Sequence, residues 1–467
     1  MAKIFGRGYE CGELEKCMAS DKSELVLICG RRRIGKTFLV ESFFDGKYAF
    51  SFTGGHNLQQ EFQLKNFTKA LKKYGKFNVE PSVNNWFEAF DVLETVLEQN
   101  RSRKKVVFID EMPWIDNAKS LFINALENFW NSFANRRKDI VFIASGSATS
   151  WMNEKIINNQ GGLYNRVTLQ LYLKPFTLKE TEEYLQSRNF VWDRYQIIQN
   201  YMVMGGVPYY LSLLDSSLSF AQNVDNLFFN SRGKLRHEFR ELYPALFKNS
   251  ESYESVVKAL NDKKSGLSRG EIAQKTQIQG GTLSKILKNL ELCDFIRSYA
   301  YFGRNTRDCV YRLTDFYTLF YFRFLENSKG VDEHFWTHSI NRPALNSWQG
   351  ITFETVCLTH IEQIKEALKI SGILTSTSTW RNDNSQIDLV IKRADRLINL
   401  CEIKFSTVPY EITSDYAAKL RQRQADFMSS TKTTYGIINT FITVYGVSKT
   451  KNSSIVQGEV TAEELFS

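Results

Sequence analysis

The feature that most constrains the fold of this chain is a glycine-rich turn between a short apolar strand and a helix. Residues 24–30 read Glu-Leu-Val-Leu-Ile-Cys-Gly, an apolar run typical of a buried parallel strand. The turn, residues 30–37, reads Gly-Arg-Arg-Arg-Ile-Gly-Lys-Thr, and the apolar stretch from Phe38 onward has the character of a helix. Strand, glycine loop with Lys-Thr, and helix together predict a phosphate-binding P-loop.

Each residue type in this loop has a chemical reason to be there. Gly30 and Gly35 let the backbone curl so that successive N–H groups and the helix N-terminus face phosphates. Lys36 would reach the terminal phosphates, and Thr37 would offer its hydroxyl to Mg²⁺. The expected ligands are therefore ATP and Mg²⁺. The residues predicted to contact the nucleotide are Gly30, Arg31, Arg32, Arg33, Ile34, Gly35, Lys36, Thr37 and Phe38.

A second apolar strand ends in a pair of carboxylates. Residues 105–111, Lys-Val-Val-Phe-Ile-Asp-Glu, place Asp110 and Glu111 where ligands bind at the carboxyl ends of a parallel sheet. We expect Asp110 to hold Mg²⁺ through its water shell, and Glu111 to orient or deprotonate the attacking water. The alternative, that an acidic pair merely ends a strand, is disfavoured by the P-loop in the same chain.

A third strand, from residue 139, has the same apolar-then-polar form and ends in Ser145-Gly146-Ser147. We expect the hydroxyl of Ser147 to sense the terminal phosphate. The alternative is structural, because a Ser-Gly-Ser turn is also an ordinary exit from a strand.

Several stretches in the first half of the chain resemble the archaeal-type ATPase family within the AAA+ and STAND group. They are the opening Phe5-Gly6-Arg7, the P-loop, the strand that continues Asp-Glu-Met-Pro-Trp, Leu163-Tyr164-Asn165-Arg166, and Gly205-Gly-Val-Pro-Tyr-Tyr210. The resemblance implies an ATPase core and a small helical lid, with Arg166 as an arginine finger or phosphate sensor. The family usually has Pro-Leu-Tyr-Gly-Arg where this chain has Gly-Leu-Tyr-Asn-Arg. An Arg166 that acts in trans would require a homo-oligomer.

The middle of the chain, residues 253–313, predicts short helices followed by a hairpin. Residues 268–271, Ser-Arg-Gly-Glu, have the form of a helix capping box, and a second helix is expected at about 282–293. Helix, turn, helix and hairpin resemble a winged helix. If this module binds DNA, the expected contacts are Lys285, Lys288 and Asn289 at the groove and Arg304 and Arg307 at phosphates. The alternative is a module that only packs or binds a protein.

The last part of the chain carries two carboxylates and a lysine on two predicted strands, residues 385–391 and 397–404. Because side chains alternate along a strand, Glu402 and Lys404 share one face, and strand pairing can bring Asp388 to the same place. Two carboxylates and a lysine so placed can hold Mg²⁺ and position water for attack on a phosphodiester.

This arrangement resembles the PD-(D/E)XK nuclease family, and its position resembles the C-terminal domain often attached to archaeal-type ATPases. The resemblance implies that Asp388 and Glu402 are metal ligands and that Lys404 is catalytic. It also implies that Glu354 is a helper on a helix and that Gln386 lies at the rim. The proline of the family motif is Ile387 here. The alternatives are a surface ion pair, or a nuclease-like fold that binds without cutting.

The length of 467 residues is about three ordinary domains. We expect an α/β protein with a P-loop NTPase core at 1–175, a helical lid at 176–240, a winged-helix domain at 241–330 and a restriction-endonuclease-like α/β domain at 331–467. Lid closure is expected to transmit the nucleotide state to the later domains.

The formal net charge of +9 permits a polyanion such as DNA as partner, although solvated basic faces explain it equally well. No apolar run of membrane-spanning length and no secretory start occur, so a cytoplasmic location without a membrane partner is expected. The seven cysteines and five histidines lack metal-ligand spacing and support neither a disulfide framework nor a zinc site.

Two functions remain open at this point. One is an ATP-dependent nucleic-acid enzyme that cuts at Asp388, Glu402 and Lys404. The other is an ATP-dependent switch whose terminal domains bind DNA or a protein partner and cut nothing.

Overall fold

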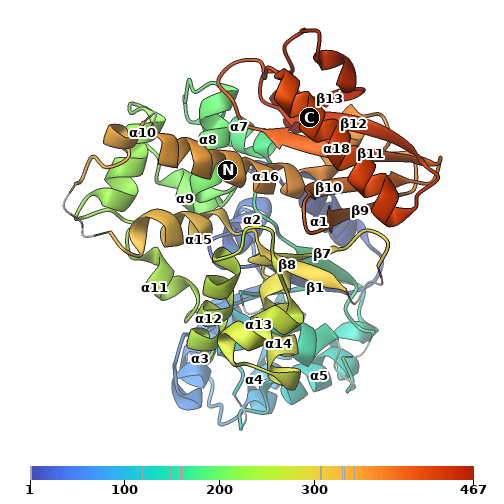
Figure 1. Ribbon diagram of the computed structural model, residues 1–467. Coiled ribbons are helices and arrows are strands. Elements are labelled where there is room, and N and C mark those ends of the chain that lie inside the picture. The colour runs from blue at the N-terminus through green and yellow to red at the C-terminus, as the bar shows by residue number, and fades with distance from the viewer. Residues whose placement is uncertain are drawn as a thin grey trace. The chain divides into compact units, whose positions relative to one another are not determined.

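The computed structural model describes residues 3–467 except 118, 148, 158–160, 164, 305–307, 329, 331 and 341. The chain forms two compact units, Met1–Lys174 and Pro175–Ser467, called unit 1 and unit 2 below (Figure 1). The bounds of the four domains expected from the sequence stay predictions. None of the helices in the described ranges combines the length and apolar character needed to cross a bilayer.

Unit 1 is built on a five-stranded sheet in the order β2-β3-β4-β1-β5. Every neighbouring pair in it is parallel. The strands are β1 (Glu24–Cys29), β2 (Phe50–Thr53), β3 (Lys105–Asp110), β4 (Ile140–Gly146) and β5 (Leu169–Tyr172). All residues of β1, β3 and β4 are buried, which explains why these three strands read as unbroken apolar runs in the sequence.

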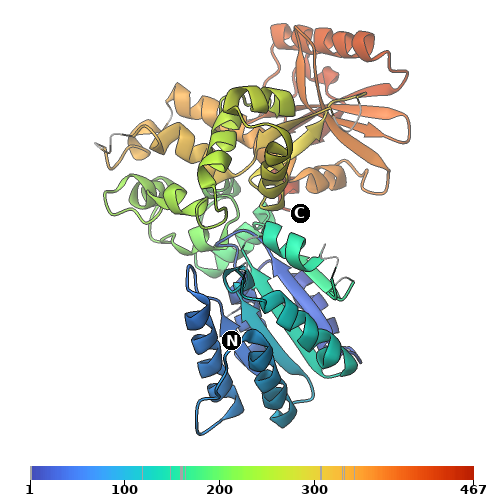
Figure 2. The same ribbon diagram turned by 90° about the horizontal axis from the view of Figure 1, so that it is seen from below.

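Helices cover both faces of this sheet, and Figure 2 shows the strands lying between them. The helices are α1 (Gly8–Ala19), α2 (Lys36–Phe44), α3 (Gln60–Gly75), α4 (Trp86–Gln99), α5 (Phe122–Ser132) and α6 (Thr149–Met152). Side chains of β1 alternate between two cores. Leu25 and Leu27 pack in the core with α3, α4 and α5. Val26 and Ile28 pack in the core with α1 and α2. The α/β class and the parallel core expected from the sequence are therefore confirmed.

Unit 2 begins with short helices: α7 (Leu178–Ser187), α8 (Arg194–Met204), α9 (Pro208–Ser212), α10 (Phe220–Val224) and α11 (Glu238–Leu242). The Gly-Gly pair between α8 and α9 has a packing reason, because a Cβ on Gly206 would lie 1.9 Å from the carbonyl oxygen of Phe176. His360 is buried, and its Nε2 accepts a hydrogen bond from the N–H of Leu178 (3.0 Å) at the start of α7. This histidine is structural.

A small module of helices and strands follows. It contains α12 (Ser250–Asn261), β6 (Leu267–Ser268), α13 (Arg269–Thr276), α14 (Gly280–Leu292), β7 (Ile296–Ala300) and β8 (Cys309–Leu313). The three strands are antiparallel in the order β6-β8-β7, and we call the whole the three-stranded module. The capping box expected at Ser268 and Glu271 is confirmed, with both reciprocal hydrogen bonds present. After it, α15 (Phe316–Phe320) returns to the helical part, where Phe316 packs against Tyr201.

The chain ends in a mixed five-stranded sheet in the order β13-β12-β11-β10-β9. Its elements are α16 (Pro343–Thr359), α17 (Ile361–Ala367), β9 (Thr375–Arg381), β10 (Gln386–Arg393), β11 (Leu397–Lys404), α18 (Ser414–Thr431), β12 (Gly436–Thr443), β13 (Gly458–Val460) and α19 (Ala462–Leu465). Strands β9, β10 and β11 are antiparallel, and β11, β12 and β13 are parallel. The N–H of Phe302, just after β7, donates to the carbonyl of Thr379 in β9 (2.9 Å), so the three-stranded module meets the edge of this sheet.

Candidate functional site: a nucleotide loop and a carboxylate cluster

The glycine loop adopts backbone conformations that glycine allows. Gly30 has φ 151° and Gly35 has φ 88°. A Cβ on Gly30 would lie 2.7 Å from the carbonyl oxygen of Leu173. Gly35 is the N-cap of α2, so the helix begins at Lys36 and its free N–H groups border the loop.

Arg7 fixes the outer side of the loop. It is buried, and its guanidinium donates to the carbonyls of Ile34 (3.2 Å) and Lys174 (2.9 Å). Arg7 of the opening Phe-Gly-Arg thus has a physical role in holding the P-loop. Ile34 is itself buried in the core, so only its backbone can face a ligand. Phe38 lies at the surface with 48% of its area exposed.

The ammonium of Lys36 lies inside the curve of the loop. Its Nζ donates to the carbonyls of Gly30 (3.0 Å) and Arg31 (3.2 Å) and to the hydroxyl of Ser147 (2.9 Å). Cys29 and Gly146 are partners in the register of β1 and β4, which explains why a residue after β4 meets the loop after β1. The positive charge is therefore held where a phosphate in the loop would meet it.

Thr37 and Asp110 form the second part of the site. The Thr37 hydroxyl donates to Oδ2 of Asp110 (2.7 Å), and the hydroxyl of Ser145 donates to Oδ1. A hydroxyl and a buried carboxylate at the head of the P-loop are the hard oxygen donors that Mg²⁺ prefers. The donor atoms of these residues fit Mg²⁺, and their role as its ligands stays a prediction.

Glu111 is held in an unusual backbone conformation, with φ 47° and ψ 46°, a left-handed region that non-glycine residues rarely adopt outside functional or tight-turn positions. Its carboxylate accepts from the hydroxyl (2.7 Å) and the N–H (3.2 Å) of Ser147. Gly54 lets this turn approach β2, because a Cβ there would lie 2.7 Å from the Glu111 carbonyl oxygen. Ser147 therefore touches both Lys36 and Glu111, a link that the sequence did not reveal.

Arg166 is not brought to this group. Its side chain is exposed and makes no hydrogen bond or ion pair with any described residue, and only its N–H is bonded, to the carbonyl of Leu163 (3.0 Å). Tyr164 in the same stretch lies outside the described residues.

A parallel α/β core with a glycine loop between β1 and a helix, and with two carboxylates at the end of β3, defines a P-loop ATPase. Comparison with known proteins agrees. Residues 4–214 match a family described as an ATPase domain predominantly from Archaea. Residues 321–419 match a family described as archaeal and bacterial proteins of unknown function. The chain is thus similar to this archaeal ATPase family over residues 4–214 and to the second family over residues 321–419.

Individual relatives are distant. The uncharacterized protein MJECL04 of Methanocaldococcus jannaschii is 24% identical over 406 residues, which cover 85% of this chain and 87% of that protein. The Walker-type ATPase PABY2304 of Pyrococcus abyssi is 19% identical, with a TM-score of 0.51 over 69% of this chain and 96% of that one, and so shows a similar fold. The ORC2 protein of Aeropyrum pernix is 14% identical with a TM-score of 0.40, covering 77% of this chain and 96% of its own.

A second cluster of charged side chains lies on the C-terminal sheet. Leu389 pairs with Cys401 in the antiparallel register of β10 and β11, so Asp388 and Glu402 lie opposite each other on the same face. Glu402 forms an ion pair with Lys404 (2.7 Å), as its place on the same strand face allows. The three residues predicted to share a site are therefore neighbours.

The carboxylates of Asp388 and Glu402 both accept hydrogen bonds from cationic and polar side chains. Asp388 accepts from Nη2 of Arg312 (3.1 Å) and from Nε2 of Gln386 (2.7 Å). Glu402 also accepts from the Tyr416 hydroxyl and from the guanidinium of Arg423. Within the described residues, no group of three His, Cys, Asp or Glu side chains is arranged to hold a metal ion. The cluster is thus an ion-pair network in this structure.

Burial and charge set the protonation of this cluster. Burial, and then the negative charge of Asp388, raises the pKa of Glu354 on α16 to about 8. Burial acts to raise the pKa of Glu402, but the charges of Lys404 and Arg423 outweigh it and lower that pKa. The cationic neighbours of Glu402 therefore favour its ionised form, whereas burial favours the protonated form of Glu354.

The residues predicted to face DNA are only partly placed as expected. Lys285, Lys288 and Arg304 are exposed, and Arg307 lies outside the described residues. Asn289 is a correction: it is 4% exposed, and its Nδ2 donates to the hydroxyl of Tyr253 in α12 (2.8 Å). Its position three residues after the buried Ile286 puts it on the packed face of α14, a signal that helical spacing already contained.

Proposed function

We propose that this ATPase is a switch in which the nucleotide bound to unit 1 controls DNA binding by unit 2. The proposed DNA binding is supported mainly by the two faces of α14. One face buries Leu283, Ile286, Leu287 and Leu290, and the opposite, polar face leaves two lysines exposed. The proposed role of ATP rests on the family match and on the geometry of the glycine loop.

In the proposed mechanism different residues of unit 1 bind the phosphates, hold the metal ion and activate the attacking water. Loop N–H groups and Lys36 bind the phosphates, and Lys36 exchanges its bonds to the Gly30 and Arg31 carbonyls for phosphate oxygens. Thr37 and Asp110 would hold Mg²⁺, which when bound neutralises charge that develops on the phosphates. Glu111 orients the attacking water and accepts its proton.

Ser147 connects these roles. Its hydroxyl lies between the Lys36 ammonium (2.9 Å) and the Glu111 carboxylate (2.7 Å). When Lys36 turns toward a phosphate, the bond between Lys36 and Ser147 is released, and Ser147 becomes free to reorient Glu111. The occupied loop thereby prepares the catalytic carboxylate. Exposed and unengaged within the described residues, Arg166 would serve the site of a second copy, so we propose that the active form is a homo-oligomer.

The arrangement of α13, α14 and the β7–β8 hairpin supports DNA binding in the manner of a winged helix. In such modules the second helix enters the major groove and basic side chains contact phosphates. The exposed face of α14 carries Thr282, Ser284, Lys285 and Lys288, all able to make such contacts.

Replacing both Lys285 and Lys288 with alanine is expected to weaken DNA binding on the order of tenfold or more at 0.1 M salt. The slope of log K against log salt should also fall by the amount that corresponds to about two phosphate contacts. Fluorescence anisotropy of labelled duplex DNA over a salt series measures both quantities. The matched control replaces the exposed Lys65 and Lys69 of α3, which changes the charge equally on another helix. Equal affinities for the two double variants would show that α14 makes no DNA contact.

Metal-dependent cleavage of DNA is a second candidate function, favoured by the facing positions of Asp388 and Glu402 beside Lys404. As carboxylates they suit a divalent cation. For this activity Asp388 must first leave Arg312, and Glu402 must leave Arg423. While these two ion pairs are intact, they favour a domain that binds DNA without cutting it.

Cleavage is tested with labelled linear, branched and single-stranded DNA in the presence of Mg²⁺ or Mn²⁺. If the cluster cuts, Asp388→Ala is expected to lose at least about 99% of the rate, as removal of a group that orients a catalytic metal does. Asp395→Ala should retain it, because Asp395 lies in the turn between β10 and β11 and pairs with Arg393 instead. Absence of cutting by the wild type, with ATP hydrolysis intact, would leave the binding switch.

A further inference from the structure

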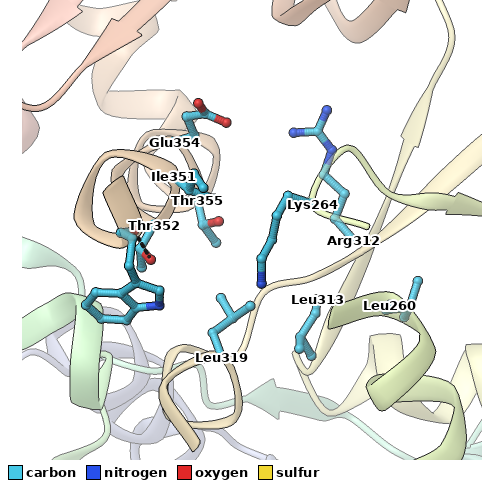
Figure 3. Close-up of a pocket in the computed structure, with 10 residues that line it drawn as sticks. Leu260, Lys264, Arg312, Leu313, Leu319, Ile351, Thr352, Glu354 and Thr355 are labelled. Carbon is cyan, nitrogen blue, oxygen red and sulfur yellow. Dashed lines mark hydrogen bonds between the residues drawn. The ribbon is translucent and has the colours of Figure 1, made fainter. Parts of the chain in front are cut away.

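A pocket in unit 2 lies between α16 and the three-stranded module (Figure 3). Lys264 and Arg312 stand on one wall, and Glu354 and Thr355 on α16 stand on the other. Its lining therefore carries two cationic side chains against one carboxyl group. In Figure 3 the guanidinium of Arg312 points toward the end of the pocket where Glu354 lies, and the Lys264 ammonium points toward Leu319.

Arg312 has an unused donor. The side chain is 6% exposed, and its Nη2 donates to Asp388 (3.1 Å) and to the hydroxyl of Thr379 (3.3 Å). The guanidinium also lies over the ring of Tyr299, 5.5 Å from its centre. Its Nε has no hydrogen-bond partner among the residues that the structure describes. Because a buried donor without an acceptor is costly, this atom calls for an acceptor that none of the described residues supplies.

Lys264 adds positive charge to the same wall. Its Nζ donates to Asn261 (2.8 Å), and its pKa is lowered by burial and then by the positive charge of Arg323. Neighbouring cations that raise each other's energy are relieved when an anion binds between or beside them. The wall is thus electrostatically suited to an anion.

We propose that this wall binds the phosphate backbone of a nucleic-acid strand, with one phosphate accepting from Nε of Arg312 and with Lys264 contributing charge along the strand. The proposal rests on the proposed function, because it adds to the exposed face of α14 a second surface of unit 2 that would hold DNA, next to the carboxylate cluster. Arg312 is the link, because its Nη2 already contacts Asp388. A phosphate is favoured over a larger ligand because the Nε–H of Arg312 can donate one charge-assisted hydrogen bond to a phosphate oxygen and because the pocket is small.

Lys264→Ala is the first test, with Lys258→Ala as its control. Lys258 is an exposed lysine of the preceding helix α12 and pairs with Glu326, so both variants remove one charge from the same region. For single-stranded and duplex DNA we expect Lys264→Ala to weaken binding about tenfold at 0.1 M salt and to lower the slope of log K against log salt by about one. Lys258→Ala should change neither quantity.

Arg312→Lys is the second test, because it keeps the charge but removes the Nε donor and the planar fork. Affinity should fall although the net charge is unchanged, and circular dichroism shows whether the variant folds. If wild-type protein binds DNA and both Lys264→Ala and folded Arg312→Lys bind it equally well, the pocket proposal is wrong while DNA binding stands.

Free phosphate is distinguished from a strand by titrating orthophosphate into Lys36→Ala protein, whose P-loop lacks its lysine, and following the thermal unfolding midpoint. If wild type binds no DNA, but orthophosphate raises the midpoint in Lys36→Ala and not in Lys36→Ala/Lys264→Ala, the pocket is a free-phosphate site, and both the strand proposal and the proposed DNA binding are wrong. No DNA binding and no phosphate effect would overturn both.

Discussion

Replacing Lys36 with alanine is expected to lower ATP hydrolysis by at least about 100- to 1000-fold, because it removes the charged donor that meets the terminal phosphates. In the structure the ammonium is already held within the loop by the Gly30 and Arg31 carbonyls and by Ser147. Release of inorganic phosphate from ATP under excess Mg²⁺ measures the effect. Nucleotide affinity should fall in the same variant.

The control for this variant is Lys47→Ala, which removes an exposed lysine soon after α2 that pairs with Asp45. It is expected to hydrolyse ATP like the wild type. Both proteins should give the circular dichroism spectrum of the wild type. Near-normal hydrolysis by folded Lys36→Ala would mean that the P-loop is not the site of ATP hydrolysis.

Glu111→Gln is expected to bind ATP with nearly unchanged affinity and to hydrolyse it about 100-fold or more slowly. The amide oxygen of glutamine can still accept the hydroxyl bond that Ser147 now gives to Glu111, so the geometry is kept while the base is lost. A titration with a fluorescent ATP analogue and a single-turnover assay separate binding from chemistry.

Glu80→Gln makes the same chemical change at an exposed position of unit 1 and should behave like the wild type. If Glu111→Gln hydrolyses ATP at the wild-type rate, another residue orients the water. If it fails to bind ATP, Glu111 shapes the site and does not act in the chemical step.

The P-loop was predictable because its signal is local. Gly30, Gly35, Lys36 and Thr37 lie in one short stretch, and the flanking apolar runs reflect the complete burial of β1. The C-terminal pair was predictable for a similar reason, because period-two alternation and one hairpin register decide that Asp388 faces Glu402.

Contacts between distant parts of the chain were not predictable. Arg312 reaches Asp388 across 76 positions, and this pair depends on β8 packing near the edge of another sheet. The bond between Ser147 and Glu111 depends on how two parallel strands end, and neither residue type alone indicates it. The prediction for Asn289 is wrong because this polar side chain lies on the packed face of α14 and is satisfied there by the Tyr253 hydroxyl.

We propose that the nucleotide on unit 1 sets the DNA affinity of unit 2. The most direct test is the dissociation constant for labelled duplex DNA, measured with Mg²⁺ and ATP, with Mg²⁺ and ADP, and without nucleotide, using Glu111→Gln to keep ATP intact. We predict affinities that differ by about tenfold or more between the ATP and ADP states, and no such difference in Lys36→Ala. The same dissociation constant in all three nucleotide states of folded protein would contradict the account.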